Sequence, residues 1–139
     1  IIITIQKIIR KMIKKILVVL VTLQLSGCAV YNTIKDSLLM APYDNNEYML
    51  IAKVRTIAKL GSCDVNSVND LYSISLELKN YSEYLPHNEK TFAMNENLFK
   101  MVDELHNKKD PSPAYCTAKL NIIGSSAETI QKSVGARPR

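Results

Sequence analysis

Apolar residues recur at alternating steps of three and four along the last part of the chain. Between residues 113 and 134 they are Cys116, Leu120, Ile123, Ala127, Ile130 and Val134. An α-helix completes a turn every 3.6 residues, so this spacing places all of them on one face. A half-buried strand would instead alternate at every second residue. The pattern therefore predicts a long amphipathic helix.

Three earlier stretches, over residues 46–60, 67–85 and 88–107, show the same periodicity. Their apolar positions are Leu50, Ile51, Val54, Ile57 and Ala58; then Leu71, Ile74, Leu78, Tyr81 and Leu85; then Met94, Leu98, Met101, Val102 and Leu105. Short links make neighbouring helices antiparallel. The sequence predicts an all-α fold, a small antiparallel bundle of about four helices.

Residues that start and stop helices separate these stretches. Gly61 and Pro86 are expected to end the first and second helices, and Asn66 or Ser67 to cap the second. Gly124-Ser125-Ser126 lowers the helix propensity of the fourth stretch, where we expect a kink or a break.

The positive charge of the chain is concentrated at its beginning. The formal net charge is +5, from 18 basic and 13 acidic residues. Five of the basic residues precede the apolar run described next: Lys7, Arg10, Lys11, Lys14 and Lys15. The remainder of the chain is formally neutral, with 13 charges of each sign. Because Lys and Arg supply most non-specific affinity for phosphates, we expect no nucleic-acid partner.

Residues 16–25 form an uncharged, mostly apolar run of about ten residues. This is the length of a signal-peptide core, whereas a membrane-spanning helix needs about 20 residues. The basic residues before it are expected to keep the N-terminus on the cytoplasmic side. Met12 is the natural start of such a segment.

The run ends in Leu25-Ser26-Gly27-Cys28, which resembles the lipobox of bacterial lipoprotein precursors. The resemblance implies a diacylglyceryl group on the Cys28 thiol, cleavage between Gly27 and Cys28, and acylation of the new amine. Two or three acyl chains anchor far more firmly than one. Ala29 after the cysteine, in place of Asp, implies export to the outer membrane, facing the periplasm.

This interpretation divides the chain into three parts. Residues 1–27 are a signal peptide, residues 28–45 a lipidated N-terminus and tether, and residues 46–139 a helical periplasmic domain.

Two cysteines, Cys63 and Cys116, remain after Cys28. An even pair in an exported domain predicts a disulfide, because that compartment is oxidising. In an up-down-up-down bundle, the end of the first helix and the start of the fourth lie at the same end. The predicted fold therefore allows the bridge.

An alternative uses His106, which is expected at the same end of the bundle. Cys63, His106 and Cys116 would offer three ligands to zinc, with Asp64 and Asp110 close in sequence. No CxxC or HxxxH spacing supports this alternative, and we expect neither a metal nor another cofactor.

The sequence contains no glycine-rich phosphate loop, GxSxG elbow or HExxH motif. A nucleophile pair of Cys116 and His106 would lose its thiolate in the disulfide. We therefore expect no enzyme. Tyr72, Tyr81, Tyr84 and Tyr115 suggest either a binding surface or packing at the bundle edge, and residues 78–84 are the stretch expected to face a partner.

These observations favour a lipid-anchored, non-enzymatic envelope protein that binds another envelope component as a scaffold, blocker or accessory subunit. The chain also resembles the small lipoproteins carried by bacteriophages and other mobile elements. Two alternatives remain open: a periplasmic metal-binding or thiol-redox protein using Cys63, Cys116 and His106, and an inhibitor of a cell-wall enzyme.

Overall fold

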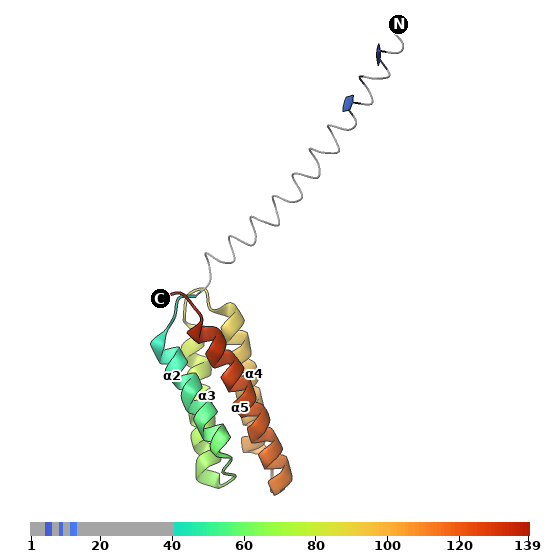
Figure 1. The fold of residues 1–139 in the computed structure, drawn as a ribbon. Helices are drawn as coiled ribbons and strands as arrows, with labels where there is room; N and C mark the ends of the chain where they lie inside the picture. Colours follow the sequence, from blue (N-terminus) through green and yellow to red (C-terminus); the bar gives the residue numbers. More distant parts are fainter. Residues whose placement is uncertain (1–4, 7–8, 10–11, 14–40) are drawn as a thin grey trace. The chain divides into compact units, whose positions relative to one another are not determined.

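The computed structural model describes residues 5–6, 9, 12–13 and 41–139. The predicted cleavage site at Gly27 and the lipidation site at Cys28 lie outside the described residues. Residues 41–139 fold into four helices, α2 (Asn45–Leu60), α3 (Val65–Glu83), α4 (Glu89–Asn107) and α5 (Pro113–Gly135). The prediction of an all-α bundle is confirmed (Figure 1).

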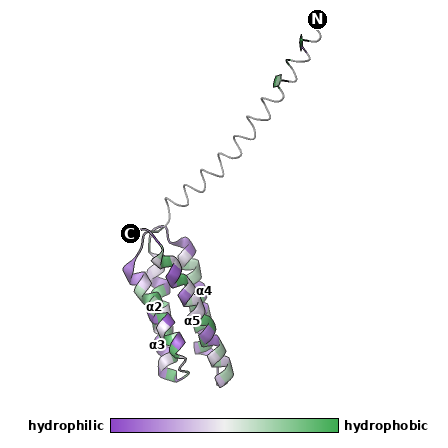
Figure 2. Cartoon of the chain, in the orientation of Figure 1, coloured by the Kyte–Doolittle hydropathy of each residue, from purple (hydrophilic) through white to green (hydrophobic). Residues whose placement is uncertain are grey.

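The four helices surround one core. Each helix packs against two others, in the ring order α2, α3, α4, α5, and each carries both hydrophobic and hydrophilic residues (Figure 2). No helix in residues 41–139 has the length and hydropathy that crossing a membrane requires. The two ends of the bundle differ in chemistry. We call the end with Asn45, Glu83, Glu89 and Gly135 the Glu47 pole, and the opposite end the disulfide pole.

Helix ends follow local side-chain chemistry. Asp44 accepts a hydrogen bond from the Glu47 amide (2.8 Å) and begins α2, and Gly61, with φ 67°, ends it as predicted. Asp64 caps α3 by accepting from the Ser67 amide (2.9 Å). The prediction of Asn66 or Ser67 as the cap is therefore wrong, because the aspartate two to three residues earlier has the free acceptor.

Helix α5 is continuous through Gly124, so the expected break is absent. The glycine serves a close approach of α5 to α2 instead. A Cβ atom on Gly124 would lie 3.2 Å from Cγ of Lys59 and 3.6 Å from Cβ of Ala58. A Cβ at this position would require the Lys59 side chain to give way by a few tenths of an ångström.

The predicted apolar face of α5 is buried at all six positions. The predicted faces of α3 and α4 are displaced. Their buried residues are Leu71, Ser75, Leu78 and Ser82 on α3, and Thr91, Asn95, Leu98, Val102 and Leu105 on α4. The apolar residues predicted there but only half-buried are Ile74, Tyr81, Leu85, Met94 and Met101.

Small polar side chains explain the displacement on α3. Ser75 donates to the Tyr72 carbonyl (3.0 Å) and Ser82 to the Lys79 carbonyl (3.1 Å). Each hydroxyl is thereby satisfied within its own helix, and burial leaves no unpaired polar atom.

Candidate functional site

A buried carboxylate lies at the Glu47 pole. The Glu47 side chain is 0% exposed and continues the apolar face of α2 by one turn. Its Oε1 accepts hydrogen bonds from Nδ2 of Asn88 (2.8 Å) and Nδ2 of Asn95 (3.2 Å). Its Oε2 accepts from Nη1 of Arg137 (2.8 Å). A buried carboxylate needs such partners, because isolated charge is strongly disfavoured away from water.

The Arg137 guanidinium is buried beside this carboxylate, with a side-chain exposure of 5%. Its Nη2 donates to Oδ1 of Asn88 (2.7 Å) and to Oγ1 of Thr91. The arginine follows the end of α5, 90 positions after Glu47. It therefore joins the last described residues of the chain to the first turn of α2 and the start of α4.

The Asn88 side chain binds this cluster instead of capping α4. It occupies the N-cap position of α4 but makes no side-chain capping bond. Its amide instead binds Glu47, Arg137 and the Ser82 carbonyl (3.1 Å). The residue before it, His87, has φ 58°, a left-handed conformation that is costly without glycine. At adjacent positions, Asn88 lacks a capping bond and His87 lacks a favourable φ. Such departures from local preference are typical of functional or strained sites.

We call Glu47, Asn88, Thr91, Asn95 and Arg137 the polar cluster. Every member is buried. One atom in it, Oδ1 of Asn95, has no hydrogen-bond partner. Buried polar atoms without partners are uncommon. The cluster holds the Arg137 guanidinium between a carboxylate, an amide oxygen and a hydroxyl.

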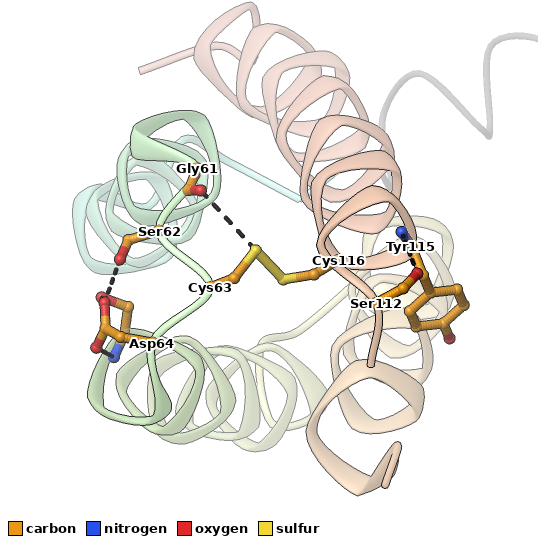
Figure 3. Close-up of a disulfide and its surroundings, with 8 residues drawn as sticks. Gly61, Ser62, Cys63, Asp64, Ser112, Tyr115 and Cys116 are labelled. Atoms are coloured by element: carbon orange, nitrogen blue, oxygen red, sulfur yellow. Dashed lines mark hydrogen bonds between the residues drawn. A yellow bond between two sulfur atoms is a disulfide. The ribbon is translucent and has the colours of Figure 1, made fainter. Parts of the chain in front are cut away.

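The disulfide pole joins Cys63 and Cys116. Their sulfurs are 2.13 Å apart and their Cα atoms 6.2 Å apart, and the predicted pairing matches the structure. The bridge connects the α2–α3 turn to the first turn of α5 (Figure 3). Cys116 is buried, whereas Cys63 is exposed. Solvent therefore reaches the bridge from the Cys63 side.

Asp64 lies next to this bridge and bears the most strongly shifted carboxyl. Hydrogen bonds from the Ser62 hydroxyl and from the amide and hydroxyl of Ser67 lower the pKa of Asp64 to about 2. Figure 3 shows the Ser62 contact beside Cys63. The shift reflects hydrogen bonds to the ionised carboxylate, first from Ser62 and then from Ser67, whose amide it caps.

His106 does not join the cysteines as a ligand set. Its Nε2 lies 3.0 Å from Oδ1 of Asn69, and its ring stacks on Tyr72 at 4.2 Å. Within the part of the chain that the structure describes, no group of three or more His, Cys, Asp or Glu side chains is placed to hold a metal ion. Asp64 is used as a helix cap, and Asp110 is exposed in the α4–α5 link.

Three of the four tyrosines proposed for a binding surface pack at the bundle edge. Tyr72 stacks on His106, and the Tyr81 hydroxyl donates to Asp44 (3.1 Å). Tyr115 packs against the core, with the Lys108 ammonium 5.2 Å from its ring. Tyr84 differs, because 85% of it is exposed. Within residues 78–84, Tyr84 is therefore the tyrosine available to a partner, and Asn80 and Glu83 are exposed as well.

A groove between α4 and α5 has a volume of about 260 Å³. Met94 and Met101, which the periodicity assigned to the core, line it together with Asn97 and Thr129. Flexible methionine side chains suit an adaptable apolar surface.

The periodicity did not reveal the polar cluster, because only apolar residues were counted. One signal was present. Glu47 lies three residues before Leu50 and four before Ile51. It therefore shares the apolar face of this helix, where it places a carboxylate one turn before the first apolar residues. Nothing local links that residue to Arg137.

No family model, curated protein or solved structure matches this chain.

Proposed function

We propose that the protein is a lipid-anchored, non-enzymatic protein of the bacterial envelope, held by acylated Cys28 in the outer membrane and facing the periplasm. The observation that carries this proposal is Leu25-Ser26-Gly27-Cys28 directly after an apolar run of signal-peptide length. The bridge between Cys63 and Cys116 supports it, because disulfides persist in oxidising compartments such as the periplasm.

The anchoring can be tested by metabolic labelling with a fatty-acid analogue. The wild-type chain should take up the label and lose residues 1–27, and Cys28→Ala should remain unlabelled and uncut. Cys63→Ala is the matched control, since it removes a different cysteine and should leave labelling intact. Label on the Cys28→Ala chain would contradict the proposal.

We further propose that the helical domain binds another envelope protein, as a scaffold, blocker or accessory subunit. Tyr84 supports this role, because tyrosine offers a large amphipathic contact area and this one is almost fully exposed. The resemblance to small lipoproteins of bacteriophages and mobile elements fits the same role at the host envelope.

A photo-crosslinking residue at position 84 tests the partner surface in cells. We expect one dominant crosslinked protein, identified by mass spectrometry. The same residue at Asn121, which is exposed on α5, is the control and should not capture that protein. Equal capture from both positions would argue against a surface around Tyr84.

The mass of the purified protein separates this proposal from the metal-binding alternative. Reduction should add about two daltons, one hydrogen for each sulfur of the bridge. A retained zinc ion would favour the alternative.

A further inference from the structure

The Glu47 pole holds an arginine side chain in a site built by other parts of the fold. Glu47 comes from the first turn of α2, while Asn88 and Thr91 come from the start of α4. The arginine itself lies beyond the end of α5. Site and occupant thus belong to different segments of the chain.

The acceptors fit a guanidinium group in particular. One nitrogen, Nη1, donates to the Glu47 carboxylate at 2.8 Å. The other, Nη2, donates to Oδ1 of Asn88 at 2.7 Å and to Oγ1 of Thr91. A planar fork reaches both sets of acceptors at once, whereas an ammonium group has one nitrogen at which all its donors meet.

The acceptors are also held in place without the arginine. Asn88 donates to Glu47 and to the Ser82 carbonyl, and Asn95 donates to Glu47. These bonds fix the orientation of the carboxylate and of the Asn88 amide. The free Oδ1 of Asn95 leaves an additional buried acceptor in the same cluster.

The residues after the arginine make two further contacts. The Tyr43 amide donates to the Pro138 carbonyl at 2.9 Å. The Arg139 guanidinium lies 4.6 Å from the centre of the Tyr43 ring, within cation–π range. The pole therefore binds Arg137-Pro138-Arg139 through a buried guanidinium, a main-chain bond and a stacked guanidinium.

We propose that Glu47, Asn88 and Thr91 form a preformed binding site for an arginine side chain on a basic segment, which the protein's own Arg137 fills in this structure. A segment of another protein carrying Arg-x-Arg can occupy the site when residues 136–139 leave it. The ligand class is an alkylguanidinium, and the resident segment is its intramolecular competitor.

Chemical rescue of an emptied site tests the proposal. The full-length Arg137→Ala protein, purified in a mild non-ionic detergent, should melt at a lower temperature than the wild type. Ethylguanidinium at about 20 mM should raise its midpoint by about 5 °C, and the rise should grow with the logarithm of its concentration, given millimolar affinity and a domain of this size.

Three controls define specific binding. Ethylammonium at the same ionic strength should give little rise in Arg137→Ala. The wild type, whose site is filled, should not respond to ethylguanidinium. The double variant Glu47→Gln/Arg137→Ala should lose the response. A rise of equal size in any of these would overturn the proposal.

If Arg137→Ala does not fold, the readout becomes recovery of its helical circular dichroism as ethylguanidinium is added. Failure to recover helix, or equal recovery with ethylammonium, overturns the proposal.

A peptide in trans tests recognition of the whole basic segment. Residues 136–139 are removed from the full chain, and acetylated Ala-Arg-Pro-Arg amide is added. We expect it to raise the melting midpoint, and the matched Ala-Lys-Pro-Lys peptide should not. An arginine peptide no more effective than the lysine peptide would contradict recognition of Arg-x-Arg.

Discussion

The two poles of the bundle join distant parts of the chain by different chemistry. At the disulfide pole a covalent bond connects positions 53 residues apart. At the Glu47 pole a buried ion pair and its amide partners connect positions 90 residues apart. A disulfide acts largely by restricting the unfolded chain. A buried ion pair acts in the folded state, where one partner without the other is strongly unfavourable.

This difference suggests separate roles. The disulfide stabilises the domain through a covalent bond, in which no other group can replace either sulfur. Such bonds persist in oxidising compartments. A buried ion pair often adds little net stability over an apolar core of equal volume, and we propose that the polar cluster instead specifies which group can occupy the pole. We therefore expect the Glu47 pole to recognise a ligand and the disulfide pole to stabilise the fold.

The largest effect should come from removing the carboxylate at the Glu47 pole. Glu47→Ala leaves the Arg137 guanidinium and two asparagine amides without their acceptor. We expect a loss of about 4 to 5 kcal/mol in the free energy of unfolding, as for other broken buried pairs. Urea denaturation of the full-length protein in mild detergent measures it. Glu77→Ala, at an exposed position on α3, is the control and should change stability by less than about 0.5 kcal/mol.

Reduction of the bridge should have the next largest effect. Opening a loop of 53 residues should lower the free energy of unfolding by about 4 kcal/mol in the chain-entropy model. Reductant should leave the double variant Cys63→Ala/Cys116→Ala unchanged, since it has no bridge to lose. An unchanged wild-type midpoint in reductant would contradict a stabilising bridge.

Hydrogen exchange can show whether the two poles are independent. In Glu47→Ala, amides near the start of α2 and α4 should exchange faster. After reduction, amides around Cys63 and the start of α5 should do so. Faster exchange at both poles after either change would show that the poles act as one unit.

A core substitution midway between the poles gives a reference for the stability losses at the two ends. Ile123 is fully buried in the middle of α5. Ile123→Ala should lower the free energy of unfolding by about 3 kcal/mol through lost burial and a cavity. Lys119→Ala, one turn earlier, removes a surface pair with Glu104 and should lower it by less than about 0.5 kcal/mol. Similar losses in the two variants would mean that α5 does not bury the face assigned to it.

The sequence predicted the parts of the fold that depend on apolar periodicity. All six core positions of α5 are apolar, so counting steps of three and four located them. On α3 and α4 the buried seam contains Ser75, Ser82 and Asn95. The apolar periodicity of α3 and α4 therefore pointed to half-buried residues. Polar residues can fill the buried positions because their hydrogen bonds are made within the helix or within the polar cluster.

The two candidate sites differed in the same way. The Cys63–Cys116 pairing was predictable because only two cysteines follow Cys28 and the topology places them at one pole. The Glu47–Arg137 pair was not predictable, since charged residues are common and no spacing relates positions 90 apart. Only the three-dimensional arrangement identifies the buried pair.

The smallest predicted effect is a pH dependence at the disulfide pole. Asp64 has a pKa of about 2 in the folded protein, mainly because the Ser62 hydroxyl and then the Ser67 amide and hydroxyl bind its ionised form. The unfolded value is about 4, so the folded state holds this proton less tightly. A depressed folded pKa gives stability that is complete above about pH 4 and is lost as the pH falls toward about 2. The difference in melting midpoint between the wild type and Asp64→Asn should therefore shrink across that interval. Ser62→Ala, which removes the largest cause of the shift, should raise the pKa of Asp64 and narrow the interval. A carboxyl titration by nuclear magnetic resonance measures the pKa of Asp64 directly, and a midpoint near 4 in the folded protein would contradict this role.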